Sequence, residues 1–287
     1  MAISMTFSSA LLCFFFSFLS LQTMSQPPQI NHLFTFCNES NNFTRHSSYH
    51  SNRLSVLSTI RSYSLLGKIT YGNATKGLSP DTAYAMYLCR GDIDKRTCSY
   101  CARTATLEIT KSCTYQKEAF MFYEECMVRV SDYYFFGTLE ESPNVTKYSL
   151  NNFSVTSSFG QTFSRKMDKL ILRAPSTSLL PKPYFVVDIE RVTEFGTSYI
   201  LHSVVQCSSD LDPSNCTVCL RLAVQDILDC CSRSRGAQIF LPKCLVRYGT
   251  FSLPVNVPNL GVIKGNKIFE RTLIAVMTAS VLALVGL

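Results

Sequence analysis

Five cysteines recur in this chain at one constant offset, and this repeat constrains the fold more than any other feature. Each member of the first set is followed 118 positions later by a member of the second. The first set is Cys89, Cys98, Cys101, Cys113 and Cys126, and the second set is Cys207, Cys216, Cys219, Cys231 and Cys244. A rare residue type at a fixed spacing is the signature of an internal repeat. The chain is therefore predicted to be two tandem copies of one cysteine-braced unit.

Residues 1–25 have the pattern of a secretory signal peptide, an apolar run rich in Phe that ends in a polar stretch. Export is supported by six Asn-X-Ser/Thr sequons, at Asn38, Asn42, Asn73, Asn144, Asn152 and Asn215. Loss of the signal peptide removes Cys13 and leaves twelve cysteines in the mature chain. Because secreted proteins mature in an oxidising compartment, we expect disulfides rather than free thiols.

The cysteines also allow two other interpretations, a structural zinc site and a redox pair. The two C-x-x-C pairs, Cys98/Cys101 and Cys216/Cys219, could supply four thiolates to one zinc ion, or either could be redox-active. Each copy has only one such pair, however, and a shared zinc would bind the two copies into one core. Redox chemistry would not require the other cysteines to keep their spacing. Disulfides are favoured, and neither a metal nor a cofactor is expected.

The repeat divides the chain into segments. Copy one is placed at residues 31–137 and copy two at residues 149–253, with a short solvated linker at 138–148 and a stalk at 254–271. Residues 272–287 form an uncharged, apolar tail. As a helix this tail spans about 24 Å, which is short of a hydrocarbon core of about 30 Å. We expect membrane attachment, either through a lipid-anchor signal or through a short span.

Hydrophobic periodicity predicts helices and strands in each copy. A helical stripe runs through Leu54, Leu57 and Ile60 in copy one, and another runs from Phe163 to Ala174 in copy two. A second helix is expected to begin near each C-x-x-C pair. The strand-like runs are 68–71, 84–89, 120–123, 126–130, 184–189, 198–205, 239–241 and 244–248. Helices and strands segregated in this way predict α+β units, with helices packed on an antiparallel sheet.

The cysteine spacing, with Tyr87-Leu-Cys89-Arg-Gly-Asp92 and Tyr123-Glu-Glu-Cys126-Met-Val-Arg129, resembles the plant ginkbilobin-homologous domain, also called domain of unknown function 26 or stress-antifungal domain. Tandem copies are similar to cysteine-rich repeat secretory proteins, to ectodomains of cysteine-rich receptor-like kinases and to plasmodesmata-located proteins. The resemblance implies two helices on a five-stranded antiparallel sheet per copy. It also implies the disulfides Cys37–Cys113, Cys89–Cys98, Cys101–Cys126, Cys207–Cys216 and Cys219–Cys244.

The resemblance leaves two thiols open. Copy two has no counterpart of Cys37, so Cys231 loses the partner that its position implies, and Cys230 is an additional neighbour. A vicinal bridge, two free thiols and a link to another chain are the three possibilities.

A sugar-binding member of the family uses an Asn after the first cysteine, an Arg six residues before the last cysteine and a Glu five residues after it. In copy one the Asn is present as Asn38, but the other two positions hold Phe120 and Ser131. In copy two the Arg and Glu positions hold Gln238 and Gly249. Phe120 and Ser131 cannot supply the charged groups that grip vicinal hydroxyls, so mannose binding of that kind is not expected. Asn38 remains the candidate sugar-binding residue, and it is also a sequon.

No catalytic constellation is found in the sequence. His202 stands alone on a predicted strand, and no nucleophile motif or phosphate-binding glycine loop occurs. The net charge of +7 is spread without a basic stripe, which disfavours nucleic acid as a partner. We expect a non-enzymatic extracellular recognition module of plant stress or defence signalling, which binds a cell-wall carbohydrate or an extracellular protein. The alternatives are a secreted antifungal mannose-type lectin and the ectodomain of a shortened receptor-like kinase or plasmodesmata-located protein.

Overall fold

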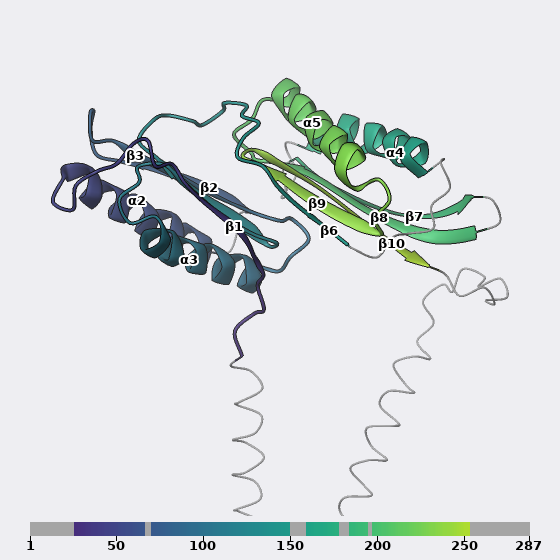
Figure 1. Cartoon of the computed structure of the whole chain (residues 1–287), viewed down its shortest axis with the longest axis horizontal. Coiled ribbons are helices and arrows are strands. Elements are labelled where there is room, and N and C mark those ends of the chain that lie inside the picture. The colour runs from purple at the N-terminus through teal and green to yellow at the C-terminus, as the bar shows by residue number, and fades with distance from the viewer. Residues whose placement is uncertain (1–25, 67–69, 150–158, 178–183, 195–196, 253–287) are drawn as a thin grey trace, which may run out of the picture. The chain divides into compact units, whose positions relative to one another are not determined.

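The computed structural model describes residues 26–66, 70–149, 159–177, 184–194 and 197–252. Within these ranges each sequence copy contains two α-helices and one five-stranded antiparallel sheet, which confirms the predicted α+β fold (Figure 1). No helix in the described ranges is long and apolar enough to cross a membrane. The predicted signal peptide, the sequon at Asn152, the stalk and the apolar tail lie outside these ranges.

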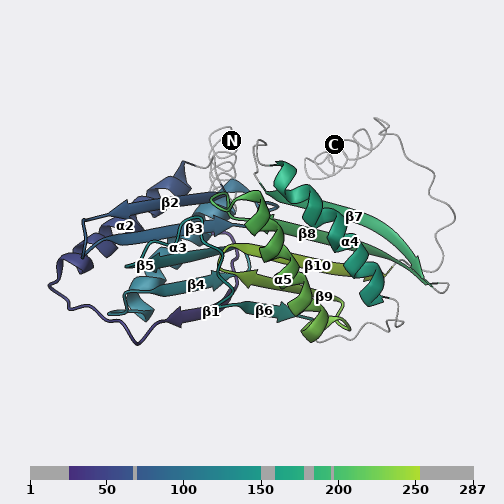
Figure 2. The ribbon, with the colours of Figure 1, turned by 90° about the horizontal axis from the view of Figure 1, so that it is seen from above.

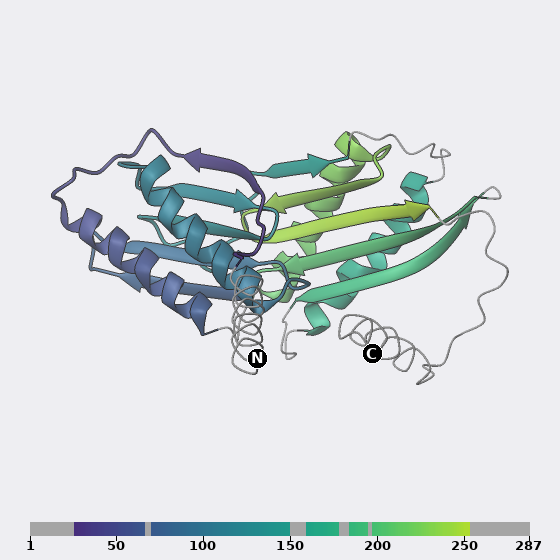
Figure 3. The same ribbon diagram turned by 90° about the horizontal axis from the view of Figure 1, so that it is seen from below.

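The first copy builds a sheet with the strand order β1-β4-β5-β3-β2. Its strands are β1 (His32–Cys37), β2 (Tyr71–Lys76), β3 (Ala83–Cys89), β4 (Ala119–Tyr123) and β5 (Cys126–Ser131). Helices α2 (Ser48–Leu65) and α3 (Lys95–Ser112) lie across one face of this sheet (Figure 3). Strand residues that alternate along β4 and β5, such as Met121 and Val128, are fully or almost fully buried in the core with these helices.

The second copy repeats this plan with the strand order β6-β9-β10-β8-β7. Its strands are β6 (Val145–Tyr148), β7 (Phe185–Glu194), β8 (Thr197–Cys207), β9 (Gly236–Leu241) and β10 (Cys244–Ser252). Helices α4 (Phe159–Arg173) and α5 (Pro213–Cys231) lie across its sheet, and a 3-10 turn, η1 (Ala174–Thr177), follows α4 (Figure 2). The predicted stripe is buried on α4, where Phe163, Met167 and Leu170 enter the second core.

Three of the helices begin at a side chain that accepts hydrogen bonds from the first turn. Ser47 accepts from the amide of His50 before α2, and Asp94 accepts from the amide of Thr97 before α3. Asp212 accepts from two amides at the start of α5, where Pro213 is the first helical residue. Such caps satisfy backbone N–H groups that have no partner within the helix, and they fix where each helix starts.

Six disulfides brace the two copies. Five join the pairs that the family resemblance implies: Cys37–Cys113, Cys89–Cys98, Cys101–Cys126, Cys207–Cys216 and Cys219–Cys244. The sixth joins the adjacent Cys230 and Cys231, which is the vicinal bridge among the three possibilities. In each copy one bridge ties a helix to the last strand, through Cys101–Cys126 and Cys219–Cys244. The bridges thereby fix the helices to the sheets that they cover.

The structure differs from the sequence prediction at three strands, two that were not predicted and one that is displaced. Residues 138–148 were predicted to be a solvated linker, but Val145–Tyr148 forms β6 and pairs with β9, so the second sheet starts four residues before residue 149. Strand β1 was not predicted from the residue pattern, and the run at 68–71 is displaced, since the strand is Tyr71–Lys76. β1, β2 and β6 are all edge strands. Their outer positions are exposed to solvent, so the alternation of apolar residues is weak.

The two sheets meet through the faces that their helices leave uncovered. Phe122 and Met127 of the first sheet share an apolar cluster with Val204, Phe240 and Leu245 of the second sheet. At the edge of this cluster the buried Lys243 Nζ lies 2.5 Å from the Asp210 carboxylate and 3.6 Å from the Met86 sulfur. The described residues from 26 to 251 belong to one compact unit.

Candidate functional site

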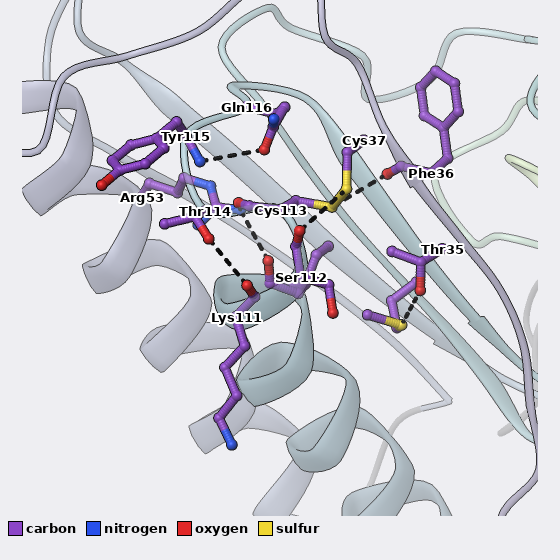
Figure 4. The surroundings of a disulfide bond; sticks show 12 residues. Thr35, Phe36, Cys37, Arg53, Lys111, Ser112, Cys113, Thr114, Tyr115 and Gln116 are labelled. Carbon is purple, nitrogen blue, oxygen red and sulfur yellow. Dashed lines mark hydrogen bonds between the residues drawn. A yellow bond between two sulfur atoms is a disulfide. The ribbon is translucent and has the colours of Figure 1, made fainter.

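Asn38 follows the last residue of β1, and the Cys37–Cys113 bridge anchors it to the end of α3. The side chains of neighbouring strand residues point to opposite faces. Figure 4 shows this at the end of β1, where the Phe36 ring extends away from the Cys37–Cys113 bridge. Phe36 thus faces the side of the sheet that the helices leave uncovered, next to Asn38.

The Asn38 side chain is held from both ends. Its Nδ2 donates to Glu118 Oε2 at 3.1 Å. Its Oδ1 accepts from the Ser40 amide at 3.1 Å and from the Ser40 hydroxyl at 2.6 Å. The Asn38 backbone amide also donates to the Glu118 carbonyl at 3.0 Å. Both the position and the orientation of the Asn38 amide are therefore fixed against Glu118.

Glu118 belongs to a buried charge network centred on Arg129 of β5. Arg129 Nη2 donates to Glu118 Oε1 and to Glu140 Oε1, both at 2.9 Å, and Nη1 also pairs with Glu140. The Tyr133 hydroxyl donates to Glu118 Oε1 at 2.5 Å. The Arg129 side chain is only 1% exposed. One guanidinium therefore holds two carboxylates in place through charge-assisted hydrogen bonds.

Aromatic rings enclose the guanidinium. The Arg129 Cζ lies 3.9 Å from the ring centre of Phe135 and 4.6 Å from that of Phe120. These contacts are cation–π interactions, which stabilise a cation that has been removed from water. Burial alone would lower the pKa of Arg129, but the hydrogen-bonded carboxylates outweigh burial and raise it. The pKa of Tyr133 is raised by burial and by its hydrogen bond to Glu118, so its hydroxyl keeps its proton.

The two carboxylates open into a pocket of about 430 Å³. We call it the Glu118 pocket. It is lined by Phe36, Glu118, Tyr133, Glu140, Glu141, Ser142 and Pro143. Its volume lies within the range of roughly 300–1,000 Å³ that is typical of small-ligand pockets. Asn38 stands behind its Glu118 wall.

The positions that the family resemblance assigns to the sugar-binding Arg and Glu lie beside this network. Phe120 covers the Arg129 guanidinium, and Ser131 is fully buried and accepts from the Tyr133 amide at 3.3 Å. Glu118 and Arg129, two residues before each of these positions, bring a carboxylate and a guanidinium to the same sheet face. The sequence interpretation missed them. Strand alternation is the signal that could have found them, because residues two apart in a strand share a face.

The corresponding positions of the second copy do not form such a pocket. Gln238 is buried between the copies, where its Nε2 donates to the Glu124 carbonyl at 3.0 Å and its Oε1 accepts from Arg90 at 3.4 Å. Gly249 pairs with Gly236 in the β9–β10 ladder. Arg247, which lies at the repeat position of Arg129, is paired with Asp92 at 3.5 Å. The described residues of copy two therefore hold no match for the Asn38–Glu118–Arg129 set.

His202 and the adjacent acidic residues Glu124 and Glu125 do not line this pocket. Burial, reinforced by the Arg247 guanidinium, lowers the pKa of His202, which lies on β8. Glu124 and Glu125 both accept hydrogen bonds from Asn31, and Glu124 also pairs with Lys147 at 2.6 Å. Among the described residues no group of three or more His, Cys, Asp or Glu side chains could hold a metal ion.

The described sequons differ in their surroundings. Asn73 Nδ2 donates to the Tyr71 hydroxyl, Asn144 Nδ2 to Asp226, and Asn215 Nδ2 to the capping carboxylate of Asp212. Asn42 Nδ2 donates to the Glu39 carbonyl at 3.3 Å. Only Asn38, of the sequon residues in the described ranges, is hydrogen-bonded to a residue that lines the Glu118 pocket.

Comparison with known proteins points to one group. The model of the family described as "Salt stress response/antifungal" matches residues 36–133 and 146–250. Cysteine-rich repeat secretory protein 8 of Arabidopsis thaliana is 53% identical over 267 residues, which cover 89% of this chain and 92% of that protein. Cysteine-rich repeat secretory protein 9 of the same plant is 45% identical over 317 residues, covering 96% of this chain and 95% of the relative.

Among solved structures, the chain is similar to two tandem DUF26 ectodomains of Arabidopsis thaliana cysteine-rich receptor-like proteins. The ectodomain of PDLP8 superposes with a TM-score of 0.61 at 24% identity, covering 76% of this chain and 98% of that one. The ectodomain of PDLP5 gives a TM-score of 0.56 at 24% identity with the same coverage. At this level of identity the likeness concerns the fold alone.

Proposed function

Because the chain belongs to the salt stress response/antifungal family of cysteine-rich secretory proteins, we propose that it is a non-catalytic recognition module that works outside the cell. We propose further that its ligand is a neutral saccharide of the cell wall and that the Glu118 pocket binds it. The proposed role in stress or defence signalling rests on the family's description. The proposed ligand rests on the pocket.

The observation that carries this proposal is the pair of carboxylates that Arg129 holds at the pocket wall. Carboxylate oxygens accept hydrogen bonds from hydroxyl groups, and neighbouring hydroxyls are what a sugar ring presents. The rings of Phe36 and Tyr133 line the same pocket. The negative face of an aromatic ring attracts the C–H edge of a sugar. Fixed acceptors beside aromatic surfaces therefore suit a saccharide.

Charge favours a neutral sugar over an acidic one. The pocket is lined by the carboxylates of Glu118, Glu140 and Glu141, while Arg129 is the cation that two of them share. The pocket wall therefore carries a net negative charge, which would repel the carboxylate of a uronate. The same net negative charge would attract a basic peptide, so a basic segment of an extracellular protein is the second candidate ligand. The binding experiment decides between the two.

The test applies the secreted chain to an array that carries neutral cell-wall oligosaccharides, oligouronates and Lys/Arg-rich peptides. The chain is made in the Ser40→Ala form, which cannot be glycosylated at Asn38. This form loses the Ser40 hydroxyl bond to Asn38 but keeps the bonds of the Asn38 side chain to the residue-40 amide and to Glu118. Binding of a neutral saccharide is expected, with an affinity that Tyr133→Ala lowers about tenfold, a loss of about 1.4 kcal/mol. Tyr134→Ala is the matched control, because its side chain is 64% exposed and does not line the pocket.

Equal affinities of the Tyr133→Ala and Tyr134→Ala forms would contradict the assignment of the pocket. Binding of basic peptides without saccharide binding would replace the saccharide by a protein ligand. Binding of oligouronates in preference to neutral sugars would overturn the charge argument.

We also propose that the protein is attached to the outer face of the plasma membrane, with residues 272–287 acting either as a lipid-anchor signal, which is removed on attachment, or as a short membrane span. Support comes from the sequence alone, since these residues are uncharged and apolar and lie outside the described ranges. If the tail is a lipid-anchor signal, a phospholipase specific for lipid anchors should release the protein from cells, and mass spectrometry should find a mature C-terminus before residue 272. If the tail is a short span, the protein should stay in the membrane fraction with residues 272–287 intact. A protein recovered wholly from the extracellular fluid would contradict attachment.

A further inference from the structure

Asn38 is hydrogen-bonded to Glu118, which lines the Glu118 pocket, and it is also the first residue of a glycosylation sequon. We propose that an N-glycan on Asn38 is seated at the mouth of this pocket, and that its presence closes the pocket to other saccharides. The second half of the proposal rests on the proposed function, because it concerns access to that same site. The seating of the glycan stands on the geometry of Asn38 by itself.

The atom that would carry the glycan already faces the pocket wall. Asn38 Nδ2 lies 3.1 Å from Glu118 Oε2, and Glu118 lines the pocket. N-glycosylation forms a bond between this nitrogen and the anomeric carbon of a lipid-linked oligosaccharide, breaks the bond from that carbon to the diphosphate, and releases one amide proton. The remaining N–H can still donate to Glu118. The first sugar would then begin beside the carboxylate.

The turn after Asn38 sets the direction of the amide. The Ser40 amide and hydroxyl both donate to Asn38 Oδ1, which leaves Nδ2 on the side of Glu118. The neighbouring sequon at Asn42 lies differently, since its Nδ2 donates to the Glu39 carbonyl. One of two adjacent sequons therefore has its Nδ2 hydrogen-bonded to a residue that lines the pocket, and the other provides a control for a glycan of the same chemistry close by.

The chemistry of such a glycan matches the proposed ligand class. The first sugar of an N-glycan is neutral and rich in hydroxyls, so the carboxylate acceptors and the Tyr133 ring that suit a free saccharide also suit the attached one. An attached sugar has a high effective concentration at the site, which lets a weak contact compete with a free ligand. Occupancy of Asn38 would thus regulate the pocket.

The test compares the secreted full-length chain with its Ser40→Ala and Thr44→Ala forms, which lose the Asn38 and Asn42 sequons respectively. Mass spectrometry of glycopeptides reports occupancy. Hydroxyl-radical footprinting reports the exposure of Tyr133, with Tyr63, 45% exposed on α2, as the reference. We expect a glycan on Asn38 and faster oxidation of Tyr133 in Ser40→Ala than in the other two forms. If the pocket is open in about a tenth of the wild-type molecules at any moment, the saccharide affinity of Ser40→Ala should be about tenfold higher than that of the wild type.

An unmodified Asn38 in the secreted protein would overturn the proposal, and so would equal oxidation of Tyr133 in all three forms. Equal saccharide affinity of the wild-type and Ser40→Ala forms would overturn the closing of the pocket. If no form binds a saccharide while Tyr133 protection still requires Ser40, the proposed function fails and the seating of the glycan is supported.

Discussion

At the scale of single residues, Arg129 determines the chemistry of the site. Its side chain is almost completely buried, lies against three aromatic rings and pairs with both Glu118 and Glu140. Removing one partner of a buried ion pair leaves the other charges buried without compensation. The same residue therefore stabilises the fold and holds the acceptors of the pocket.

Replacing Arg129 by Met is expected to lower the free energy of unfolding by about 3–5 kcal/mol, because two carboxylates lose their shared cation. Lys147→Ala is the matched control, since this lysine pairs with Glu124 with its side chain 48% exposed. Surface pairs contribute about 0–1 kcal/mol. Urea denaturation of the two variants measures both values, and a loss no larger than that of Lys147→Ala would contradict the role given to Arg129.

Asp210 provides a test that depends on pH. Burial alone would raise its pKa, but the Lys243 ammonium lowers it below the ordinary value of about 3.9. A carboxyl with a depressed folded-state pKa adds stability above its unfolded pKa and loses it as the pH falls. The free energy of unfolding should therefore decline below about pH 4, and less steeply in Asp210→Asn. Urea titrations at a series of pH values check this, and identical slopes for both proteins would refute it.

At the scale of elements, most of the fold could be predicted from the sequence, because buried helices and central strands carry strong patterns. The cysteine offset predicted the duplication, and the stripe through Phe163 and Met167 predicted α4. β1 and β6 could not be read from the residues, since edge strands alternate weakly. The Arg129 network could not be predicted from the sequence either. It depends on the register of the strands and on the path of the chain after β5, which brings Glu140 back to Arg129.

The disulfides of the second copy make a prediction about loop length. Cys219–Cys244 closes a separation of 25 residues and Cys207–Cys216 one of 9. In the chain-entropy account, the longer loop should contribute about 1 kcal/mol more to stability. Double Cys→Ala variants of each bridge, compared by chemical denaturation, are expected to differ in this direction. A larger loss on removing the shorter bridge would contradict the entropic account.

At the scale of the whole molecule, the two copies share an interior. Gln206 is fully buried, accepts from the Gly91 amide at 2.8 Å and donates to the Cys89 carbonyl at 2.9 Å, and so joins β8 to the first copy. Apolar side chains of both sheets also form one shared cluster. We therefore expect the two copies to unfold together.

Calorimetry should show one unfolding transition for the chain. Gln206→Ala is expected to lower the free energy of unfolding by about 1–3 kcal/mol without splitting this transition, because it removes two buried hydrogen bonds between the copies. Gln225→Ala is the control on the exposed side of α5, where Gln225 donates to Asp229, and it should change stability by less than about 0.5 kcal/mol. Two separate transitions in the unmodified chain would show that the copies are independent.

In the proposed function, the Glu118 pocket of the first copy binds a neutral saccharide, and the described residues of the second copy form no counterpart of it. The most direct measurement is a two-dimensional NMR titration of the Ser40→Ala protein with the neutral oligosaccharide that binds best on the array. The account predicts saturable shifts at Phe36, Glu118 and Tyr133 that disappear in Tyr133→Ala. Shifts confined to the second copy, or no shifts at any concentration of neutral sugar, would contradict it.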